Sequence, residues 1–415
     1  MSVERVDEPS CQRGQGAIVS DLQGPVAPAA SVLSRGRRRR RLLIAAPFLA
    51  ALCWAVVSYT TWMVRPSSLS WGVNSVEWVR HEAPFGNWLA DEVEQRYYSW
   101  KAPKKGGPAR TTLPAVGVNG TQHPPATQRA AAWPPPIRPV FPQPLAGEGT
   151  WNPTGPSVNG GLPVLVTTYR PELDYPRQVA YVAWFDATRT QLAYYPGRYE
   201  PPHAAVRGPM MVPDSQRWRL LATFNGGFTY VDGHNGSTDN GRVNEPLKDG
   251  NATLVSYRDG HVDIVNWTGG PNAGPEVACA RQSLAPIVWD GVVNPALNDN
   301  PNSPQWGYSL GGRTRVWRTG VGIDARGNLI YVAADGQTVI TLAKMLQHVG
   351  AVRAMELDIN PEWHTLVTYT HNPDLVPTLV GPNPMQSPHR YLVRDDRDFF
   401  AIYQPLPGPV TVPFD

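Results

Sequence analysis

The stretch ATLVSYRDGHVDIVNW, residues 252–267, predicts an antiparallel β-hairpin. Its two halves, 252–257 and 262–267, are rich in the β-branched and apolar residues that strands favour. An Asp-Gly pair lies between them and suits a tight turn, because glycine adopts positive φ without steric cost. This stretch therefore predicts a domain built largely from strands.

Similar short apolar runs occur on both sides of the hairpin, and Gly, Asn, Asp or Pro bounds each of them. They predict strands at residues 162–169, 178–185, 192–195, 220–224, 287–289, 320–323, 328–333 and 354–357. One amphipathic helix is expected from Thr338 to Val349, because an apolar face there is followed by Gly350, a residue suited to end a helix. The prediction is a mixed α+β domain over residues 158–415, strand-rich and globular with few helices.

Near the N-terminus, residues 42–64 contain no charged side chain. About 20 apolar residues span a bilayer as a helix, so this run predicts a single transmembrane helix. Five arginines, residues 37–41, precede it directly and favour a cytoplasmic position for residues 1–41, with the rest of the chain outside the cell membrane. A cleaved signal peptide is the alternative, but the run is longer than an ordinary signal core and no small-residue cleavage site follows.

Charge and cysteine content argue against nucleic-acid binding, a disulfide framework and a cysteine metal site. The net charge of +3 is nearly balanced, and the arginines stand beside the apolar run, so no nucleic-acid partner is expected. The three cysteines form no disulfide framework and no metal set, since the predicted topology separates Cys11, Cys53 and Cys279. Cys279 is expected to be a small buried apolar residue.

Two segments connect the membrane helix to the domain. Residues 65–101 predict juxtamembrane helices interrupted at Pro84. After Pro84, large apolar side chains recur at three- and four-residue steps: Phe85, Trp88, Leu89, Val93, Tyr97 and Trp100. This stripe suits the outer membrane surface, a partner helix or the chain's own domain. Residues 102–157 hold 13 prolines in their first 55 positions and predict a semi-rigid linker that keeps the domain away from the membrane.

Two motifs offer groups that can bind a ligand. Asn225, Gly226 and Gly227 follow a predicted strand, where glycines let backbone approach a ligand closely, although a simple turn has the same composition. In the next motif, Arg315 and Arg318 lie on opposite faces of a strand, and Arg313 shares a face with Arg315. Arginine forks match phosphate oxygens, and a solvated strand face explains the same residues equally well.

Carboxylates gather around the predicted helix. Glu356 and Asp358 are two residues apart in a predicted strand, so their side chains project from the same face. Glycosidases require two carboxylates that flank the scissile bond, although such pairs also occur on solvated strands. Asp335 ends the strand before the helix and is either a third catalytic carboxylate or a turn cap.

No cofactor is expected. A polar loop leaves a structural calcium ion open, with a plain flexible loop as the simpler interpretation; its oxygen-bearing residues are Asp232, Asn235, Asp239 and Asn240.

Taken in order, these motifs resemble the phosphodiester glycosidase family. The resemblance rests on FNGGF at 224–228, RTGVGI at 318–323, Asp335-Gly336 and Leu357-Asp358, and it covers roughly residues 220–369. It implies hydrolysis of a sugar-1-phosphodiester, which releases the sugar and leaves a phosphomonoester. It also implies which residues line the active site: Asn225, Gly226, Gly227, Arg318, Asp335 and Asp358.

The chain departs from the family after Leu357-Asp358, where the family usually has a glycine- and serine-rich run. Here Ile359 and Pro361 cannot reproduce a cradle of backbone amides, because one is bulky and the other lacks an N–H. Either Asn360 and Trp363 take over substrate recognition, or hydrolysis has been lost.

We expect a membrane-anchored extracytoplasmic hydrolase that acts on a sugar-phosphate diester of an envelope glycan or a lipid-linked sugar. A non-catalytic module that binds wall polymers, and a scaffold for other envelope proteins, are the alternatives. The sequence does not identify protein partners.

Overall fold

The computed structural model describes residues 32–67, 69–117, 133–233, 235–309, 312–383 and 386–413. The chain divides into two compact units, Met1–Ser58 and Tyr59–Asp415. Helix α1 (Val32–Met63) contains the segment Leu43–Met63, which is long and apolar enough to cross a membrane. Its length and composition fit a membrane anchor or a signal sequence. The predictions for residues 1–31, which include Cys11, lie outside the described residues.

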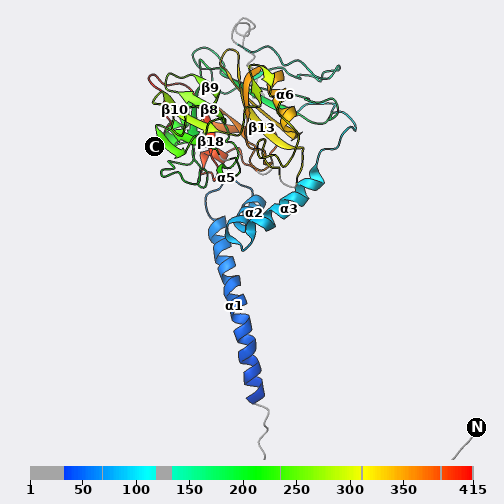
Figure 1. Cartoon of the computed structure of the whole chain (residues 1–415), viewed down its shortest axis with the longest axis vertical. Coiled ribbons are helices and arrows are strands. Elements are labelled where there is room, and N and C mark those ends of the chain that lie inside the picture. The colour runs from blue at the N-terminus through cyan, green and yellow to red at the C-terminus, as the bar shows by residue number, and fades with distance from the viewer. Residues whose placement is uncertain are drawn as a thin grey trace, which may run out of the picture. The chain divides into compact units, whose positions relative to one another are not determined.

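Within the second unit, the described strands form three antiparallel sheets (Figure 1). The eight-stranded sheet has the order β1 (Asn152–Thr154), β2 (Val164–Tyr169), β3 (Ala180–Phe185), β14 (Leu329–Gln337), β13 (Val316–Asp324), β15 (Ala351–Glu356), β11 (Val288–Trp289) and β12 (Val292–Val293). A five-stranded sheet has the order β7 (Arg242–Glu245), β6 (Ser237–Asp239), β10 (Val277–Gln282), β8 (Ala252–Tyr257) and β9 (Val262–Asn266). The other has the order β17 (Leu375–Leu379), β16 (Leu366–His371), β5 (Leu220–Asn225), β18 (Phe399–Tyr403) and β4 (Gln191–Tyr195).

Helices are few in the described chain, as the strand-rich prediction required. Beside α1 they are α2 (Trp71–Glu82), α3 (Gly86–Lys101), the short α5 (Tyr230–Gly233) and α6 (Val339–His348), with 3₁₀ turns η1 (Asp214–Arg219) and η2 (Arg390–Leu392). Helix α6 begins at a capping box in which Thr338 and Thr341 bond each other's backbone amides, and its apolar face is buried. The interruption between α2 and α3 falls at the predicted proline.

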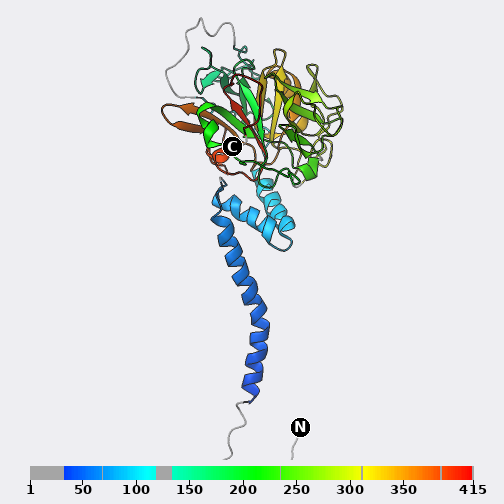
Figure 2. The same cartoon turned by 90° about the vertical axis from the view of Figure 1, so that its left-hand side faces the viewer.

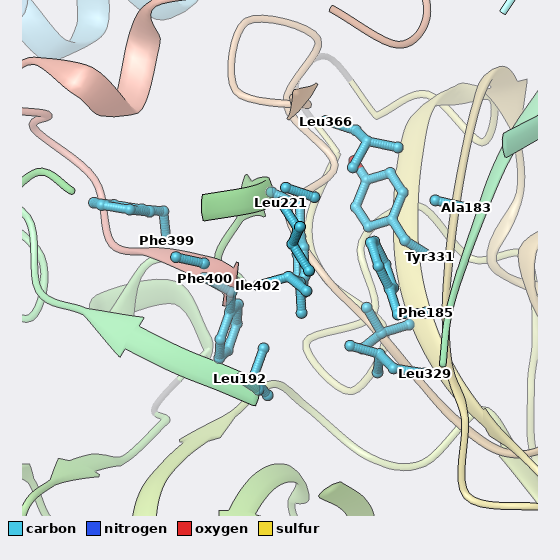
Figure 3. Packing of buried hydrophobic residues seen from close by; sticks show 14 of the residues in the cluster. Ala183, Phe185, Leu192, Leu221, Leu329, Tyr331, Leu366, Phe399, Phe400 and Ile402 are labelled. Atoms are coloured by element: carbon cyan, nitrogen blue, oxygen red, sulfur yellow. The ribbon is translucent and has the colours of Figure 1, made fainter. Parts of the chain in front are cut away.

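The eight-stranded sheet is buried on both faces. Along β3, Tyr181 and Phe185 pack into a core shared with the two smaller sheets, whereas Val182 and Trp184 pack against α6 and its surroundings. Figure 3 shows the shared core, with Phe185 and Tyr331 facing residues of β4, β5 and β18. Alternate residues of a strand point to opposite faces, so burial of both faces explains the nearly continuous apolar runs.

Most strand predictions are confirmed, and β8 pairs with β9 as the opening hairpin predicted. The prediction missed several strands: β1, β6, β7, β10, β12, β16, β17 and β18. Cys279 lies in β10 with 1% of its surface exposed, so the expectation of a buried cysteine is confirmed.

The predicted linker is partly integrated into the domain. Ile137 and Trp151 are buried in the core around α6, and Glu148 forms a buried ion pair with Arg170 of 2.8 Å. Strand β1 also lies inside the predicted linker range. The domain therefore begins before residue 158, and residues 133–157 are not a spacer.

Helix α2 lies next to the C-terminal end of α1. The Tyr59 hydroxyl is 2.9 Å from the Ser75 hydroxyl, and the Trp62 indole donates to Asn74 at 3.0 Å. His81 of α2 stacks on Tyr199 of the domain with ring centroids 4.8 Å apart. These contacts, all within the unit Tyr59–Asp415, join the last turn of α1 to the helical hairpin α2–α3 and the hairpin to the domain (Figure 1, Figure 2).

Candidate functional site

A cavity of about 1050 Å³ lies between the helical hairpin α2–α3 and the strand ends of the domain. Five of the predicted site residues line it: Arg315, Asp335, Asp358, Asn360 and Trp363. The other five are absent from its lining: Asn225, Gly226, Gly227, Arg318 and Glu356. The predicted set is thus divided between the wall of one cavity and the structure that supports this wall.

Asp358 is the carboxylate at the centre of this wall. It follows β15, and its backbone N–H donates to the Gly226 carbonyl at 3.2 Å, which ties it to the end of β5. One carboxylate oxygen accepts from the Arg397 guanidinium at 2.7 Å, and the other accepts from the Asn360 backbone at 2.9 Å. Burial raises the pKa of Asp358, and the charge of Arg397 opposes that rise. A carboxyl group of this kind is suited to proton transfer.

Glu356 lies behind Asp358 and is fully buried. It pairs with the Arg318 guanidinium, which also donates to the Gln337 carbonyl at 3.0 Å. Burial raises the pKa of Glu356 to about 7 in spite of the neighbouring Arg318. Arg318 is therefore already neutralised inside the protein and does not face a ligand in the cavity.

Asn225 joins the ends of several strands. Its amide nitrogen donates to the Gly226 carbonyl at 2.9 Å and to the Thr319 hydroxyl at 3.0 Å. Its carbonyl oxygen accepts from the Tyr331 hydroxyl at 2.8 Å and the Thr365 amide at 3.1 Å. All hydrogen-bonding groups of this amide are thus used within the protein, and Asn225 fixes the wall rather than contacting the cavity.

Gly226 and Gly227 are required for close packing. A Cβ at Gly226 would lie 2.5 Å from an Asp398 carboxylate oxygen, and one at Gly227 would lie 2.9 Å from the Ser283 hydroxyl. Neither glycine has positive φ. The close backbone approach that the sequence predicted is therefore made to the protein's own side chains.

The loop after Asp358 uses its backbone amides internally. The Asn360 amide bonds Asp358, the Glu362 amide donates to the Asn360 side chain at 2.8 Å, and the Trp363 amide donates to the Asn360 carbonyl at 3.0 Å. Ile359 is buried against Phe228 and Leu284. The amides of Asn360, Glu362 and Trp363 therefore have partners within the loop.

Aromatic side chains line the same wall. Trp363 has 4% of its surface exposed, and the guanidinium carbons of Arg390 and Arg397 lie 5.0 and 5.3 Å from its ring. Little of this ring remains to stack on a sugar. Trp317 and His364 also line the cavity and stack on each other with centroids 3.7 Å apart. Trp317 is half-buried, so it is more accessible than Trp363.

Arg315 and Asp335 form another part of the cavity wall. The Arg315 guanidinium makes two 2.8 Å bonds to Glu172 and a third of 2.8 Å to the Gly336 carbonyl. Burial raises the pKa of Asp335. Arg315 is thus neutralised by a carboxylate, whereas Asp335 is a second acid in the cavity with proton affinity above its ordinary value.

Sequence reasoning missed Arg397 and Glu200, which both line the cavity. The Arg397 Nε is buried without a hydrogen-bond partner among the described residues. Glu200 accepts from the Tyr230 amide at 3.1 Å, and burial raises its pKa while Arg397 opposes the rise. The charged run RDDRD at 394–398, directly before an apolar strand, was a sequence signal for Arg397. Glu200 had no comparable signal.

A buried ion pair supports this region and was also missed. Arg281 donates to Asp398 at 2.6 Å and to the Phe228 carbonyl at 2.7 Å, and its guanidinium lies over the Tyr230 ring. A charged residue inside the apolar strand 277–282 was a signal, because buried charges are nearly always paired.

One group of described carboxylates has metal-ligand spacing: Glu77, Glu94 and Glu362 offer oxygens within 4.8 Å of one another. Arg80 lies among them and bonds Glu77 at 3.3 Å and Glu94 at 2.7 Å, so an arginine already supplies positive charge there.

The polar loop for which the sequence left a calcium ion open forms hydrogen bonds and an ion pair within the protein. Asp239 pairs with Arg242 and accepts from Asn244 at 2.7 Å, whereas Asp232 accepts from Thr229 at 2.5 Å. The Asn235 side chain accepts from the Leu284 amide at 3.0 Å. The loop's oxygens therefore have separate protein donors.

Comparison with known proteins agrees with the motifs. Residues 203–358 match the phosphodiester glycosidase family model. The resemblance predicted from the ordered motifs is thereby confirmed for this segment, which contains Asn225, Arg318, Asp335 and Asp358 but ends before Arg397. No curated protein matches the chain.

Among solved structures, the chain is similar to the zebrafish N-acetylglucosamine-1-phosphodiester alpha-N-acetylglucosaminidase catalytic domain auto-inhibited by pro-peptide. Identity is 16%, with 58% of this chain and 82% of that chain covered and a TM-score of 0.38. A hypothetical protein from Synechocystis is 12% identical, with coverages of 60% and 64% and a TM-score of 0.36. A putative exported protein from Burkholderia pseudomallei is 12% identical, with coverages of 55% and 74% and a TM-score of 0.28.

Proposed function

We propose that this protein is a membrane-anchored extracytoplasmic hydrolase that cleaves a sugar-1-phosphodiester of the cell envelope. The observation that carries the proposal is the Asp358–Arg397 pair in the wall of the cavity, with Asp358 inside the segment that matches the family model. An arginine beside a carboxylate of raised pKa supplies both a phosphate ligand and a proton-transfer group.

In this reaction, water adds to the anomeric carbon as the bond from that carbon to the phosphate oxygen breaks. The sugar is released, and the phosphate remains as a monoester. Arg397, which lines the cavity beside Asp358, holds the phosphate oxygens. Asp358 lies beside that phosphate and protonates the leaving oxygen, and Asp335 or Glu200 accepts the proton of the attacking water.

Glu356 has a supporting role in this proposal and is not one of the proton-transfer groups. Because Glu356 is fully buried and absent from the cavity lining, it does not reach a substrate there. It holds Arg318 in place behind Asp358. We therefore assign Glu356 and Arg318 as positioning residues.

The full chain, purified in detergent, should release a phosphomonoester from a sugar-1-phosphodiester, as detected by phosphorus NMR. Asp358→Asn should lower turnover by about 10²-fold or more, because it removes the proton donor. Asp259→Asn is the matched control, since that side chain is 69% exposed on the β8–β9 turn. Turnover in Asp358→Asn equal to that of the control would refute the assignment of Asp358.

A binding module without turnover is the second candidate. It is favoured by Ile359, which packs into the protein where the family usually has glycine, and by Pro361, which has no N–H to offer. Retained binding of a sugar-phosphate polymer, with no product from the unmodified chain, would select this candidate.

A further inference from the structure

The face of α3 that points away from the cavity carries large exposed apolar side chains. Phe85, at the start of the helix, is 86% exposed, Trp88 is 68% exposed and Trp100 is 81% exposed. Leu89 and Val93 lie between them on the same face and are also exposed. The opposite face is different, since Ala90 and Glu94 are buried. The chain's own domain therefore does not cover this stripe, which removes one of the three interpretations of the sequence.

This face lies on a hairpin that is attached to the end of the apolar helix. Tyr59 bonds Ser75 of α2 at 2.9 Å and packs edge-on against Trp78 with centroids 5.2 Å apart. Trp62 donates to Asn74 of the same helix at 3.0 Å. Tyr59 and Trp62 belong to the segment Leu43–Met63 that is apolar enough to cross a membrane. The hairpin is thus held within a side chain's reach of the point where such a helix leaves the bilayer.

We propose that the exposed face of α3, defined by Phe85, Trp88, Leu89, Val93 and Trp100, docks into the interfacial layer of the membrane that α1 spans. The proposal rests on the membrane anchor included in the proposed function. Tryptophan and phenylalanine favour the layer of lipid headgroups, where their rings lie between water and hydrocarbon. An amphipathic helix with such a face lies in the plane of the membrane with its apolar side buried.

Charge on this face is compatible with lipid. Glu92 and Arg96 project near the stripe and pair with each other at 2.7 Å, so they add no net charge. Trp71, at the start of α2, is 72% exposed and adds a further aromatic ring to the hairpin. The alternative occupant of this stripe is a second protein. Lipid is favoured over it because the proposed anchor holds the hairpin at the membrane.

The docking places the candidate site at the membrane surface. Asp91 and Gln95 line the cavity, whereas Trp88 and Trp100 project from the exposed face of the same helix. A helix with its side chains is about 10–12 Å thick. The cavity then lies about one helix thickness from the headgroups, within reach of a sugar phosphodiester that is attached to a lipid.

A fluorescent label on single cysteines tests the docking. The full chain is placed in lipid nanodiscs with a nitroxide on the acyl chain of some lipids, and quenching of an environment-sensitive dye is measured. In a Cys11→Ser background the native Cys53, exposed on the apolar helix, reports insertion of the anchor. After Cys53→Ser, the dye is placed by Trp88→Cys or, in a second variant, by Trp100→Cys; Cys279 is buried and stays unlabelled.

Trp218→Cys is the matched control, because Trp218 is 60% exposed on the domain and outside the hairpin. Docking predicts that lipid nitroxide quenches the dye at positions 88 and 100 at least about threefold more strongly than the dye at position 218. Equal quenching at 88, 100 and 218, with strong quenching at Cys53, would overturn the docking and leave the anchor intact. Weak quenching at Cys53 as well would overturn both. A dye at position 88 shielded from lipid nitroxide and from aqueous iodide would show a protein partner instead, and would also overturn the docking.

Discussion

The buried pair of Arg318 and Glu356 allows a prediction with a defined magnitude. The two side chains are 4% and 0% exposed, and one Glu356 oxygen has no hydrogen-bond partner among the described residues even in the intact pair. Arg318→Met keeps the length of the side chain but leaves a buried carboxylate without its positive partner. Loss of one partner from a buried ion pair costs about 3–5 kcal/mol.

For a domain of this size each kcal/mol lowers Tm by about 2–4 °C, so Arg318→Met should lower Tm by roughly 6–20 °C. The assay is thermal unfolding of the full chain in detergent at pH 8, followed by circular dichroism. The double variant Arg318→Met with Glu356→Gln should recover much of the loss, because no unpaired charge remains. At pH 5 the loss in Arg318→Met should shrink, since the pKa of Glu356 is raised to about 7 and the group is then protonated. A Tm within 2 °C of the unmodified chain at pH 8 would refute this account of the buried pair.

Two further predictions follow from the same region. The pKa of Glu356 is raised from 4.5 to about 7, so the folded chain binds this proton more tightly than the unfolded chain, and the stability from this group is present below pH 4.5 and lost as pH rises to 7. Glu356→Gln should therefore gain Tm relative to the unmodified chain between pH 5 and pH 7.5, whereas the exposed Glu276→Gln should show no such trend. Gly226→Ala would bring a Cβ to 2.5 Å from Asp398 and should cost about 1–3 kcal/mol in urea unfolding. Gly72→Ala, where no atom lies within 4 Å, is its control, and equal stability of the two variants would contradict the packing argument.

The local elements of the fold could be predicted because each is decided by a few neighbouring residues. The β8–β9 hairpin follows from two apolar runs around an Asp-Gly turn, and α6 follows from an apolar face between a capping box and a glycine. Strands β16 and β18 were missed although they are largely buried, because both are short and lie within polar and proline-containing sequence.

The candidate site could be predicted only in part. Asp358 and Asn360 follow β15 and Asp335 lies near the end of β14, and they could be found because strand ends converge at the edges of a sheet. Arg397 comes from a different part of the chain, 39 residues after Asp358, and the two meet only through the pairing of β18 with β5. The family motifs do not include it, since the matched segment ends at residue 358.

Several residues that were predicted to bind the substrate form their bonds with other residues of the protein instead. Asn225 uses its whole amide to join strand ends, and Arg318 is neutralised by Glu356. Motif order identifies such residues but does not distinguish a side chain in a cavity wall from one behind it. That distinction depends on burial and on which donors and acceptors have partners, and both are properties of the assembled structure.

The sequence by itself determined the strand-rich class, the apolar helix, the family resemblance and the carboxylates near the site, because periodicity, composition and motif order are local properties. Tertiary structure alone decided that Arg397 pairs with Asp358, that α2–α3 forms a wall of the cavity and that the end of the predicted linker belongs to the domain. The physical reason is that these features depend on contacts between residues far apart in the chain. Such contacts form only when the burial of apolar surface brings the sheets and the helical hairpin together.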